Sequence, residues 1–269
     1  MALFDIAVNF GASALASKIP TIVDQALAND VEAMIALGCN LESSRHALSV
    51  AKLFPQTVYA TAGIHPHDAK TFDHTTLKSL TDLSKMPEVV ALGECGLDFN
   101  RDFSPRDKQI EVFESQLQLA CELKMPVVMH QRDAHDAFMK VLSNYRSDLN
   151  NVVVHCFTGS QQELESYLEL DCHIGITGWI CDERRGLHLL DSVKIIPDNR
   201  LMLETDAPYL MPRNMQPKPK SRNNQPANLF HIANTVADAR NQDRELLRRN
   251  CFDNTMKFFN LTIKQESIC

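Results

Sequence analysis

Val89-Val90-Ala91-Leu92-Gly93-Glu94 is a short apolar run that ends in a carboxylate. Three further runs have the same form: Val127-Val128-Met129-His130, Val152-Val153-Val154-His155 and Leu201-Met202-Leu203-Glu204-Thr205-Asp206. Nearly continuous apolar residues predict strands that helices cover on both faces, because neither side of such a sheet meets water. A titratable residue therefore closes each of four predicted buried strands.

Candidate strands recur along the whole chain at a mean interval of about 28 residues, close to the length of one strand-helix unit. Alternation of strands and helices predicts a parallel sheet, either closed or doubly wound. At 269 residues and 44% hydrophobic composition, the chain has the usual size of an α/β TIM (β/α)8 barrel, so we expect one such domain over residues 1–269. The candidate strands begin near Leu3, Val31, Thr57, Val89, Pro126, Val152, His173 and Leu201.

The clearest predicted helix runs from about Pro105 to Lys124, where apolar residues recur at spacings of three and four. Ser104 is expected to cap its free amide groups, and Pro105 suits the first helical position. Residues 210–222 are too rich in proline for a helix or an inner strand, so they predict an extended, cationic loop. Two closing helices are expected at roughly 226–240 and 243–260.

The formal net charge of -7 argues against a protein that coats long nucleic acid through a broad basic surface, although a local basic patch remains compatible with it. The 8 cysteines include no Cys-x-x-Cys pair, which favours reduced, buried thiols and a cytoplasmic location. No apolar stretch reaches about 18 residues, so no membrane-spanning segment is expected. We also expect a monomer.

The carboxyl ends of all strands in a parallel barrel meet at one rim. Glu94, His130, His155 and Asp206 are therefore candidate ligands of one divalent metal. Two imidazoles and two carboxylates suit zinc or manganese better than magnesium, but magnesium becomes suitable if the substrate contributes phosphate oxygens. Asp206 and Glu94 are also the candidate catalytic carboxylates, with Asp206 the expected base toward an attacking water.

Each of these residues, taken alone, is as readily a satisfied core histidine, a helix cap or a salt-bridge partner. Their matching positions at four strand ends favour a shared site. Side chains alternate in direction along a strand, so Glu204 is expected to share the inward face with Asp206. We expect Glu204 to hold a metal ligand, or to balance charge, from one layer below.

Candidate substrate-binding residues lie on the loops expected at the same rim. His67, in Gly63-Ile64-His65-Pro66-His67-Asp68, could donate to a phosphate, whereas His65 could be only a loop anchor. Arg132 follows His130 by two residues and is the other favoured phosphate ligand. Further cations, and two aromatic residues available for base stacking, are Arg184, Arg185, Arg213, Lys218, Lys220, Arg222, Tyr209 and Trp179. The arginines could equally be solvated charges, and Trp179 could be a core residue.

Five motifs, in this order, closely resemble the TatD family of metal-dependent deoxyribonucleases. The resemblance implies an amidohydrolase-type TIM barrel, hydrolysis of phosphodiester bonds, and a divalent metal at Glu94, His130 and His155, with Asp206 as the last aspartate of the metal site. For the type member it further implies a magnesium-dependent 3'-5' exonuclease of single-stranded DNA and RNA, with a role in repairing oxidatively damaged DNA. The motifs are Ala62-Gly63-Ile64-His65-Pro66-His67, Gly93-Glu94-Cys95-Gly96-Leu97-Asp98, Met129-His130-Gln131-Arg132-Asp133, His155-Cys156-Phe157-Thr158-Gly159 and Glu204-Thr205-Asp206-Ala207-Pro208-Tyr209.

One departure from the family pattern concerns the first predicted strand. Many members carry a His-x-His pair at its end, where this chain has Ala7 and Asn9. Ala7 cannot bind a metal, and Asn9 offers only a neutral amide oxygen. The type member shares this variant, so we expect one firmly held metal and a second recruited with the substrate.

Two other functions fit parts of the pattern. The same scaffold could hydrolyse another ester, such as that of aminoacyl-tRNA. The absence of two histidines at positions 7 and 9 would suit a metal-depleted binding protein. We favour the exonuclease because of the family resemblance and the shared rim position of the candidate ligands, and the presence of all four of them argues against the binding protein.

Overall fold

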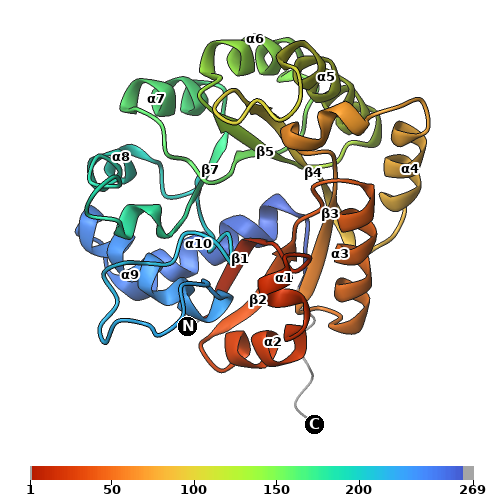
Figure 1. Ribbon diagram of the computed structural model, residues 1–269. Coiled ribbons are helices and arrows are strands. Elements are labelled where there is room, and N and C mark those ends of the chain that lie inside the picture. The colour runs from red at the N-terminus through yellow and green to blue at the C-terminus, as the bar shows by residue number, and fades with distance from the viewer. Residues whose placement is uncertain (1, 263–269) are drawn as a thin grey trace.

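A closed barrel of parallel strands forms the centre of the molecule (Figure 1). The computed structural model describes residues 2–262, and the strands within this range pair in parallel in sequence order. A parallel bridge between Val8 and Ala207 joins the two ends of the sheet, which confirms the predicted TIM barrel. The strands are β1 (Leu3–Val8), β2 (Val31–Ala36), β3 (Val58–Ala62), β4 (Val89–Asp98), β5 (Val127–Arg132), β6 (Val152–Val154), β7 (His173–Ile176) and β8 (Leu201–Leu203).

Helices surround the barrel and alternate with its strands. The helix predicted from Pro105 is α5, and the two predicted closing helices are α9 and α10. The expectation of a single domain over residues 1–269 stays a prediction, and it includes Met1 and residues 263–269, which lie outside the described residues. The helices are α1 (Ser13–Ala16), α2 (Ile19–Leu27), α3 (Leu41–Leu53), η1 (Pro66–Thr71), α4 (Thr76–Leu83), α5 (Arg106–Leu123), α6 (His135–Tyr145), α7 (Gln161–Glu169), η2 (Gly178–Cys181), α8 (Leu189–Ile195), η3 (Pro226–Asn228), α9 (Leu229–Arg240) and α10 (Arg244–Phe258).

The amino end of α5 differs from the prediction. Pro105 is the N-cap residue, and no side chain caps the helix. Ser104 Oγ donates to the carbonyl oxygen of His67 at 2.8 Å and accepts from the Lys70 amide at 3.1 Å. The predicted Ser104 cap is wrong because this hydroxyl instead holds the 3-10 helix η1 against the loop before α5.

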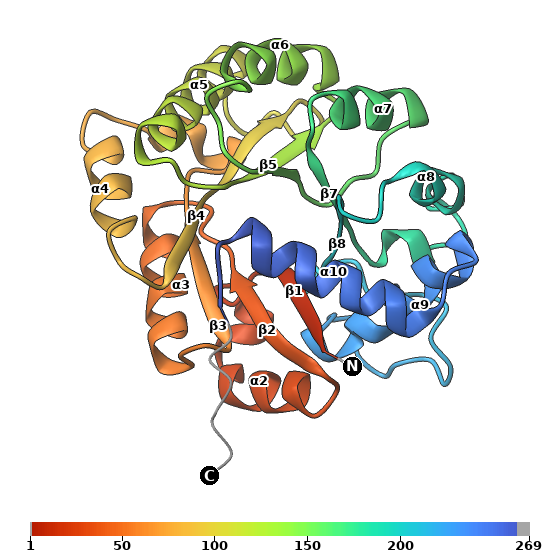
Figure 2. The same ribbon diagram turned by 180° about the vertical axis from the view of Figure 1, so that it is seen from behind.

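The inside of the barrel is packed with apolar side chains rather than open. Phe4, Ile6, Ile35, Val128, Val153 and Met202 belong to one buried cluster that also includes Phe258 and Phe259. Figure 2 shows α10 lying across this end of the barrel. Side chains that point inward from alternate positions along the strands fill the interior, so the barrel is a packed core and not a pore.

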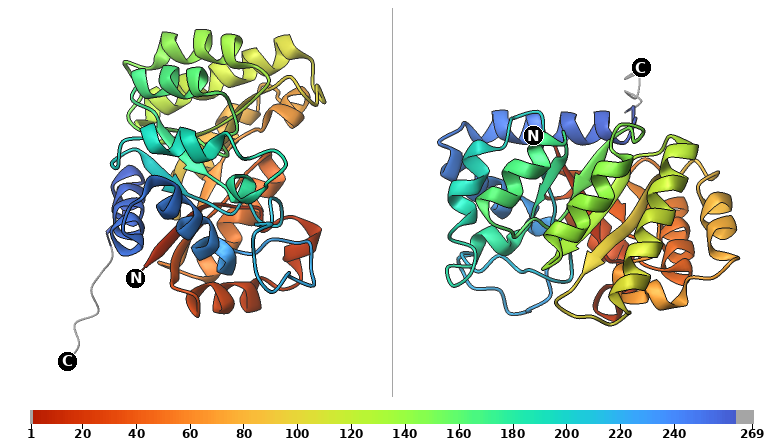
Figure 3. Two further views of the ribbon diagram at one scale, coloured as in Figure 1. Left: turned by 90° about the vertical axis from the view of Figure 1, so that its left-hand side faces the viewer. Right: turned by 90° about the horizontal axis from the view of Figure 1, so that it is seen from above.

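The two ends of the barrel have different roles. Contacts of Phe258 with His173 and of Asn254 with the Leu201 carbonyl place α10 at the amino ends of the strands. The predicted extended loop, residues 210–222, contains no helix or strand and lies at the opposite end (Figure 3). The carboxyl ends of the strands are therefore left open to form a site.

Strand β4 runs four residues past Glu94, to Asp98. Its register with β5 shifts between Leu92 and Cys95. Gly93 and Gly96 have φ of +131° and +138°, and a Cβ on Gly96 would collide with the carbonyl oxygen of His130. Glycine thus permits β4 to approach β5 closely, which brings Asp98 to the same rim as Glu94.

Two further sequence expectations concern the thiols and membrane segments. The cysteines within residues 2–262 are all free, and Cys269 lies outside the described residues. No helix in the described part of the chain combines the length and apolar character needed to cross a membrane.

Candidate metal centre

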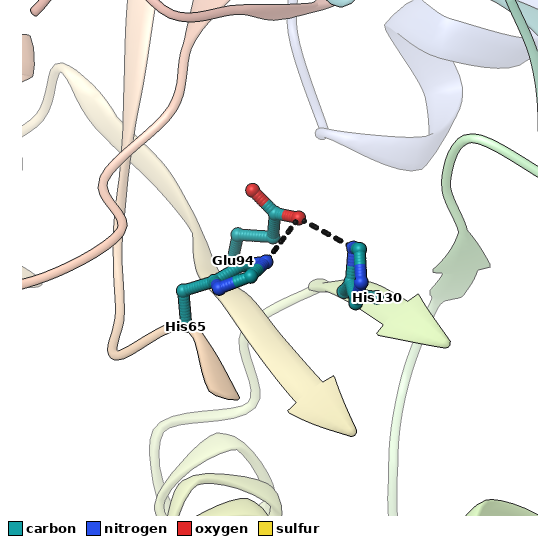
Figure 4. A group of neighbouring side chains, drawn as sticks. All are labelled: His65, Glu94 and His130. Carbon is teal, nitrogen blue, oxygen red and sulfur yellow. Dashed lines mark ion pairs between the residues drawn. The ribbon is translucent and has the colours of Figure 1, made fainter. Parts of the chain in front are cut away.

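Glu94 lies at the centre of a group of three imidazoles at the carboxyl end of the barrel. Its Oε1 is 2.7 Å from His155 Nε2, 3.0 Å from His130 Nδ1 and 3.3 Å from His65 Nε2. Figure 4 shows the rings of His65 and His130 directed at this one carboxylate oxygen. The ligand atoms of His65, Glu94 and His130 all lie within 4.8 Å of one another, a spacing compatible with a metal ion.

Glu204 holds His155 from below. His155 Nδ1 is 3.1 Å from Glu204 Oε2, and the other oxygen of Glu204 accepts from the backbone amide of Cys156. Glu204 is completely buried. A carboxylate on one ring nitrogen fixes the orientation of the other, as is usual for metal-binding histidines.

The backbone that carries Glu204 and Asp206 differs from the regular strand that the sequence predicts. Strand β8 ends at Leu203, and Asp206 has φ of +53°, so regular alternation does not extend to Asp206. Glu204 still lies next to a candidate ligand. The expectation of a shared strand face is wrong because regular strand geometry ends at Leu203 and Asp206 takes a left-handed backbone conformation.

A divalent cation fits these donor atoms. Glu204 accepts the Nδ1 proton of His155, and a proton on Nε2 is shared with Glu94 Oε1 at 2.7 Å. A divalent cation would replace that Nε2 proton, because the deprotonated nitrogen and the carboxylate oxygen both offer it lone pairs. In addition, His130 Nε2 is buried, and Asp98 Oδ2 lies 3.5 Å away, too long for a strong hydrogen bond.

Asp206 lies on the loop that closes the barrel. Its backbone amide donates to the Ala7 carbonyl at 3.0 Å, and Asn9 Nδ2 donates to its Oδ1 at 2.8 Å. Asn9 therefore uses its amide to position Asp206. The second carboxylate oxygen, Oδ2, has no side-chain hydrogen bond within the described residues.

The charges in the cluster stabilise one another. Burial disfavours an ionised Glu94, but His155, His65 and His130 outweigh it and hold the pKa of Glu94 well below its usual range. Burial likewise opposes a charged His155, yet Glu94 and Glu204 raise its pKa well above the usual value. At Asp206, burial together with the charges of Glu94 and Glu204 outweighs His155 and the Asn9 hydrogen bond, so its pKa rises to about 7.

The side chains of this cluster, apart from Glu204 beneath them, line a cavity of about 490 Å³. It contains the four predicted metal ligands and the two predicted substrate residues, His67 and Arg132. Trp179, Arg185 and Tyr209 line it as well, whereas Arg184, Arg213, Lys218, Lys220 and Arg222 do not. Arg184 and Arg213 instead lie 2.6 and 3.6 Å from carboxylate oxygens of Asp182.

Sequence reasoning missed several residues of this cavity. The sequence indicates no more than a possible loop anchor at His65, but its ring contacts Glu94. Asp98 was not singled out, although its Oδ2 is 2.7 Å from His67 Nε2. Cys39 Sγ donates to Glu94 Oε2 at 3.5 Å, and Arg101 also lines the cavity. The position of Asp98 at the end of the Glu94 motif was the available signal; Cys39 and Arg101 had none.

Comparisons with known proteins agree with this arrangement. The sequence model of the family described as TatD related DNase matches residues 4–260. A Musicola paradisiaca protein named 3'-5' ssDNA/RNA exonuclease TatD is 47% identical, over 98% of this chain and 100% of its own length. An Erwinia billingiae protein of the same name is 46% identical, over 96% of this chain and 99% of its own.

Solved structures give the same fold. A TatD homologue from Escherichia coli matches 97% of this chain and 98% of its own with a TM-score of 0.87 at 27% identity. A TatD family hydrolase from Entamoeba histolytica, at 23% identity, has a TM-score of 0.88 over 97% of this chain and 100% of its own, which supports the fold alone. With a family match along almost its whole length and relatives at nearly half identity, the chain belongs to the TatD-related DNase family of hydrolases.

Proposed function

We propose that this protein is a metal-dependent 3'-5' exonuclease that hydrolyses phosphodiester bonds of single-stranded DNA and RNA. The observation that carries the proposal is the Glu94 carboxylate, surrounded by imidazoles, in a cavity that arginines also line. A cation with adjacent arginines suits a phosphodiester, whose transition state gains negative charge. The names of the two bacterial relatives support the same reaction and strand preference.

Glu94, His130, His155 and Asp206 are the proposed metal ligands, and the contact of His65 with Glu94 adds a fifth candidate. A divalent ion bound there would polarise the scissile phosphate and make a nearby water more acidic. We propose Mg²⁺ as the functional ion, since phosphate oxygens complete its preferred shell, with Mn²⁺ or Zn²⁺ as possible substitutes.

Asp206 is the proposed proton acceptor. Asn9 holds Oδ1, so Oδ2 can take the proton from the attacking water while the backbone of Asp206 stays tied to Ala7. Glu94 keeps its charge beside the imidazoles and holds them in place around the reacting phosphate. The reaction thus needs a fixed base on one side of the scissile phosphate and fixed cations on the other.

Arg132, Arg101 and His67 are the proposed phosphate-binding residues. The three side chains line the cavity, and His67 is fixed by the 2.7 Å contact of its Nε2 with Asp98. Because the Nε2 proton is donated to Asp98, His67 donates to a phosphate oxygen from Nδ1 as the imidazolium, in which both ring nitrogens carry a proton. Guanidinium groups bind phosphate through two parallel N–H bonds, which suits Arg132.

Product analysis tests the proposal against the alternative ester hydrolase. Purified protein is incubated with single-stranded DNA and, separately, with aminoacyl-tRNA in the presence of Mg²⁺. Nucleoside monophosphates should appear, and Glu94→Gln should abolish them, whereas Glu165→Gln, the same change at an exposed position, should not. Released amino acid without nucleotides would establish the deacylase instead.

The biological setting belongs to the same proposal. The family resemblance implies repair of oxidatively damaged DNA, which predicts that cells lacking the protein become sensitive to peroxide. A cytoplasmic, monomeric protein remains our expectation. Sedimentation and cell fractionation would test these two points.

A further inference from the structure

The single tryptophan of the chain, Trp179, packs against the core on one side and lines the cavity. It belongs to the short helix η2, directly after β7. The guanidinium of Arg185 lies over its ring, with Cζ 4.4 Å from the ring centroid, and Arg185 lines the same cavity. Neither contact is required by the metal centre.

The loop that joins these two residues is tightly closed. The Asp182 amide donates to the Trp179 carbonyl at 3.0 Å, and the Gly186 amide donates to the Asp182 carbonyl at 2.7 Å. The indole N–H of Trp179 donates to the Arg185 carbonyl at 3.4 Å. A Cβ on Gly186 would collide with the Trp179 carbonyl, so only glycine permits this closure.

Asp182 holds one edge of the Arg185 guanidinium. Its carboxylate is only 8% exposed, and its Oδ2 is 3.4 Å from an Arg185 terminal nitrogen. The Arg185 side chain is nevertheless 58% exposed. The guanidinium therefore lies over the indole with one terminal nitrogen near Asp182, and much of the Arg185 side chain remains exposed to solvent.

We propose that Trp179 and Arg185 form a nucleobase-stacking platform that binds a base of the single strand whose terminal phosphodiester lies at Glu94. A base approaches a guanidinium through its face, whereas a phosphate approaches through the N–H edge. In Arg185 one terminal nitrogen is near Asp182 and the guanidinium lies over the indole of Trp179, an arrangement that suits stacking of a base.

The chemistry of such a platform suits this site. Every base presents a π-face to an aromatic or guanidinium plane, so stacking tolerates any sequence. An exonuclease must accept each terminal nucleotide in turn, and a sequence-tolerant contact meets that need. The inference rests on the proposed function for the class of ligand, but its test does not depend on turnover.

Because Trp179 is the only tryptophan, protein fluorescence excited in the indole band reports on the platform alone. We would titrate the wild-type protein with a short single-stranded oligonucleotide whose phosphorothioate linkages resist cleavage, with Mg²⁺ and with EDTA. The comparison ligand is an abasic oligonucleotide of equal length, which carries the phosphates without the bases. The normal strand should quench Trp179 in saturable fashion, and the abasic strand should not.

Matched variants separate stacking from charge. Arg185→Lys keeps the charge but loses the planar group, and we expect it to weaken binding of the normal strand by about tenfold while affinity for the abasic strand is unchanged. Arg184→Lys is the control, since Arg184 is 54% exposed in the same loop but outside the cavity. It should leave both affinities as in the wild type. The affinity of Trp179→Leu for the normal strand, measured by fluorescence anisotropy of a labelled strand, should fall by at least the same factor as that of Arg185→Lys.

Equal quenching by normal and abasic strands, unchanged binding in Arg185→Lys, or no binding at all would overturn the platform. Failure of the platform and failure of the exonuclease are distinguishable. Base-dependent quenching without strand shortening would retain the platform and reject the reaction. Strand shortening without base-dependent quenching would retain the exonuclease and reject the platform.

Discussion

Glu204 makes the clearest prediction at the scale of a single residue. It touches the candidate ligand His155 and the Cys156 amide but does not line the cavity. Glu204→Gln keeps the size of the side chain and removes the charge that orients the imidazole. We expect metal affinity to fall about 10- to 100-fold with the fold retained. Titration of the metal-free protein with Mn²⁺ measures this loss.

The control for Glu204→Gln is Glu165→Gln, the same chemical change on the exposed side of α7. It should leave Mn²⁺ affinity at the wild-type value. If both variants bound Mn²⁺ as tightly as the wild type, Glu204 would have no part in supporting the metal site.

His65 provides a second residue-scale prediction. Its Nε2 is 3.3 Å from Glu94, so His65→Ala should weaken metal binding and reduce turnover, while a surface histidine such as His74 should tolerate the same change. Calorimetric metal titration of His65→Ala and His74→Ala would compare them. A loss confined to thermal stability, with metal affinity intact, would return His65 to the role of loop anchor.

The sequence predicted which residues meet at the rim where a pattern repeats, and their roles stay predictions. Glu94, His130 and His155 each follow an apolar run, and the barrel brings them together with Asp206. His65 and Cys39 could not be assigned in this way, because their contacts with Glu94 depend on the path of loops after β3 and β2. Asn9 looked like a lost ligand, whereas its amide positions Asp206.

At the scale of elements, β7 and α10 make stability depend on pH. His173, the first residue of β7, packs against Phe258 of α10 with ring centroids 5.0 Å apart. Burial lowers the pKa of His173 from 6.5 to about 4. The unfolded chain therefore binds this proton more readily, so stability is complete above pH 6.5 and is lost as the pH falls toward 4.

A shift of that size corresponds to roughly 3 kcal/mol of unfolding free energy across the window. Urea unfolding of the wild type and of His173→Gln, on both sides of the window, tests it. The variant should lose less stability on acidification than the wild type does. Parallel pH profiles would show that other groups govern acid unfolding.

Helices α5 and α6 pack through aromatic side chains. Phe138 is completely buried and stacks on Phe113 with ring centroids 5.0 Å apart. Phe138→Ala should reduce the unfolding free energy by about 3–5 kcal/mol, because it leaves a cavity in the core. Leu53→Ala, at a position 71% exposed on α3, serves as the control and should cost less than about 0.5 kcal/mol. Chemical denaturation compares the two, and similar losses would contradict this packing.

Element boundaries followed from the sequence where hydrophobic spacing is regular, as in α5 and the closing helices α9 and α10. The sequence did not predict the boundaries that depend on contacts with loops. Ser104 bonds to η1 instead of capping α5. Strand β4 continues to Asp98 because two glycines allow it to approach β5, and periodicity does not reveal such an approach.

At the scale of the whole molecule, an overall charge of -7 is combined with a cavity that Arg101, Arg132 and Arg185 line. Affinity for single-stranded DNA should fall with salt but with a shallow slope, since only about two or three phosphates are neutralised. Arg132→Ala should reduce the slope of log K against log salt by about 0.7. Lys78→Ala, an exposed lysine paired with Asp82, should not change it. Anisotropy titrations at several salt concentrations give both slopes, and identical slopes would remove Arg132 from the phosphate path.

The central claim is that a metal held around Glu94 removes nucleotides from the 3' end of a single strand. The most direct test is incubation of the protein with 5'-labelled single-stranded DNA and Mg²⁺, Mn²⁺, Zn²⁺ or EDTA, resolved on a sequencing gel. We expect a metal-dependent ladder that shortens from the 3' end and disappears with EDTA. Intact DNA with every metal, together with no metal bound after dialysis, would contradict the claim and favour the metal-depleted binding protein.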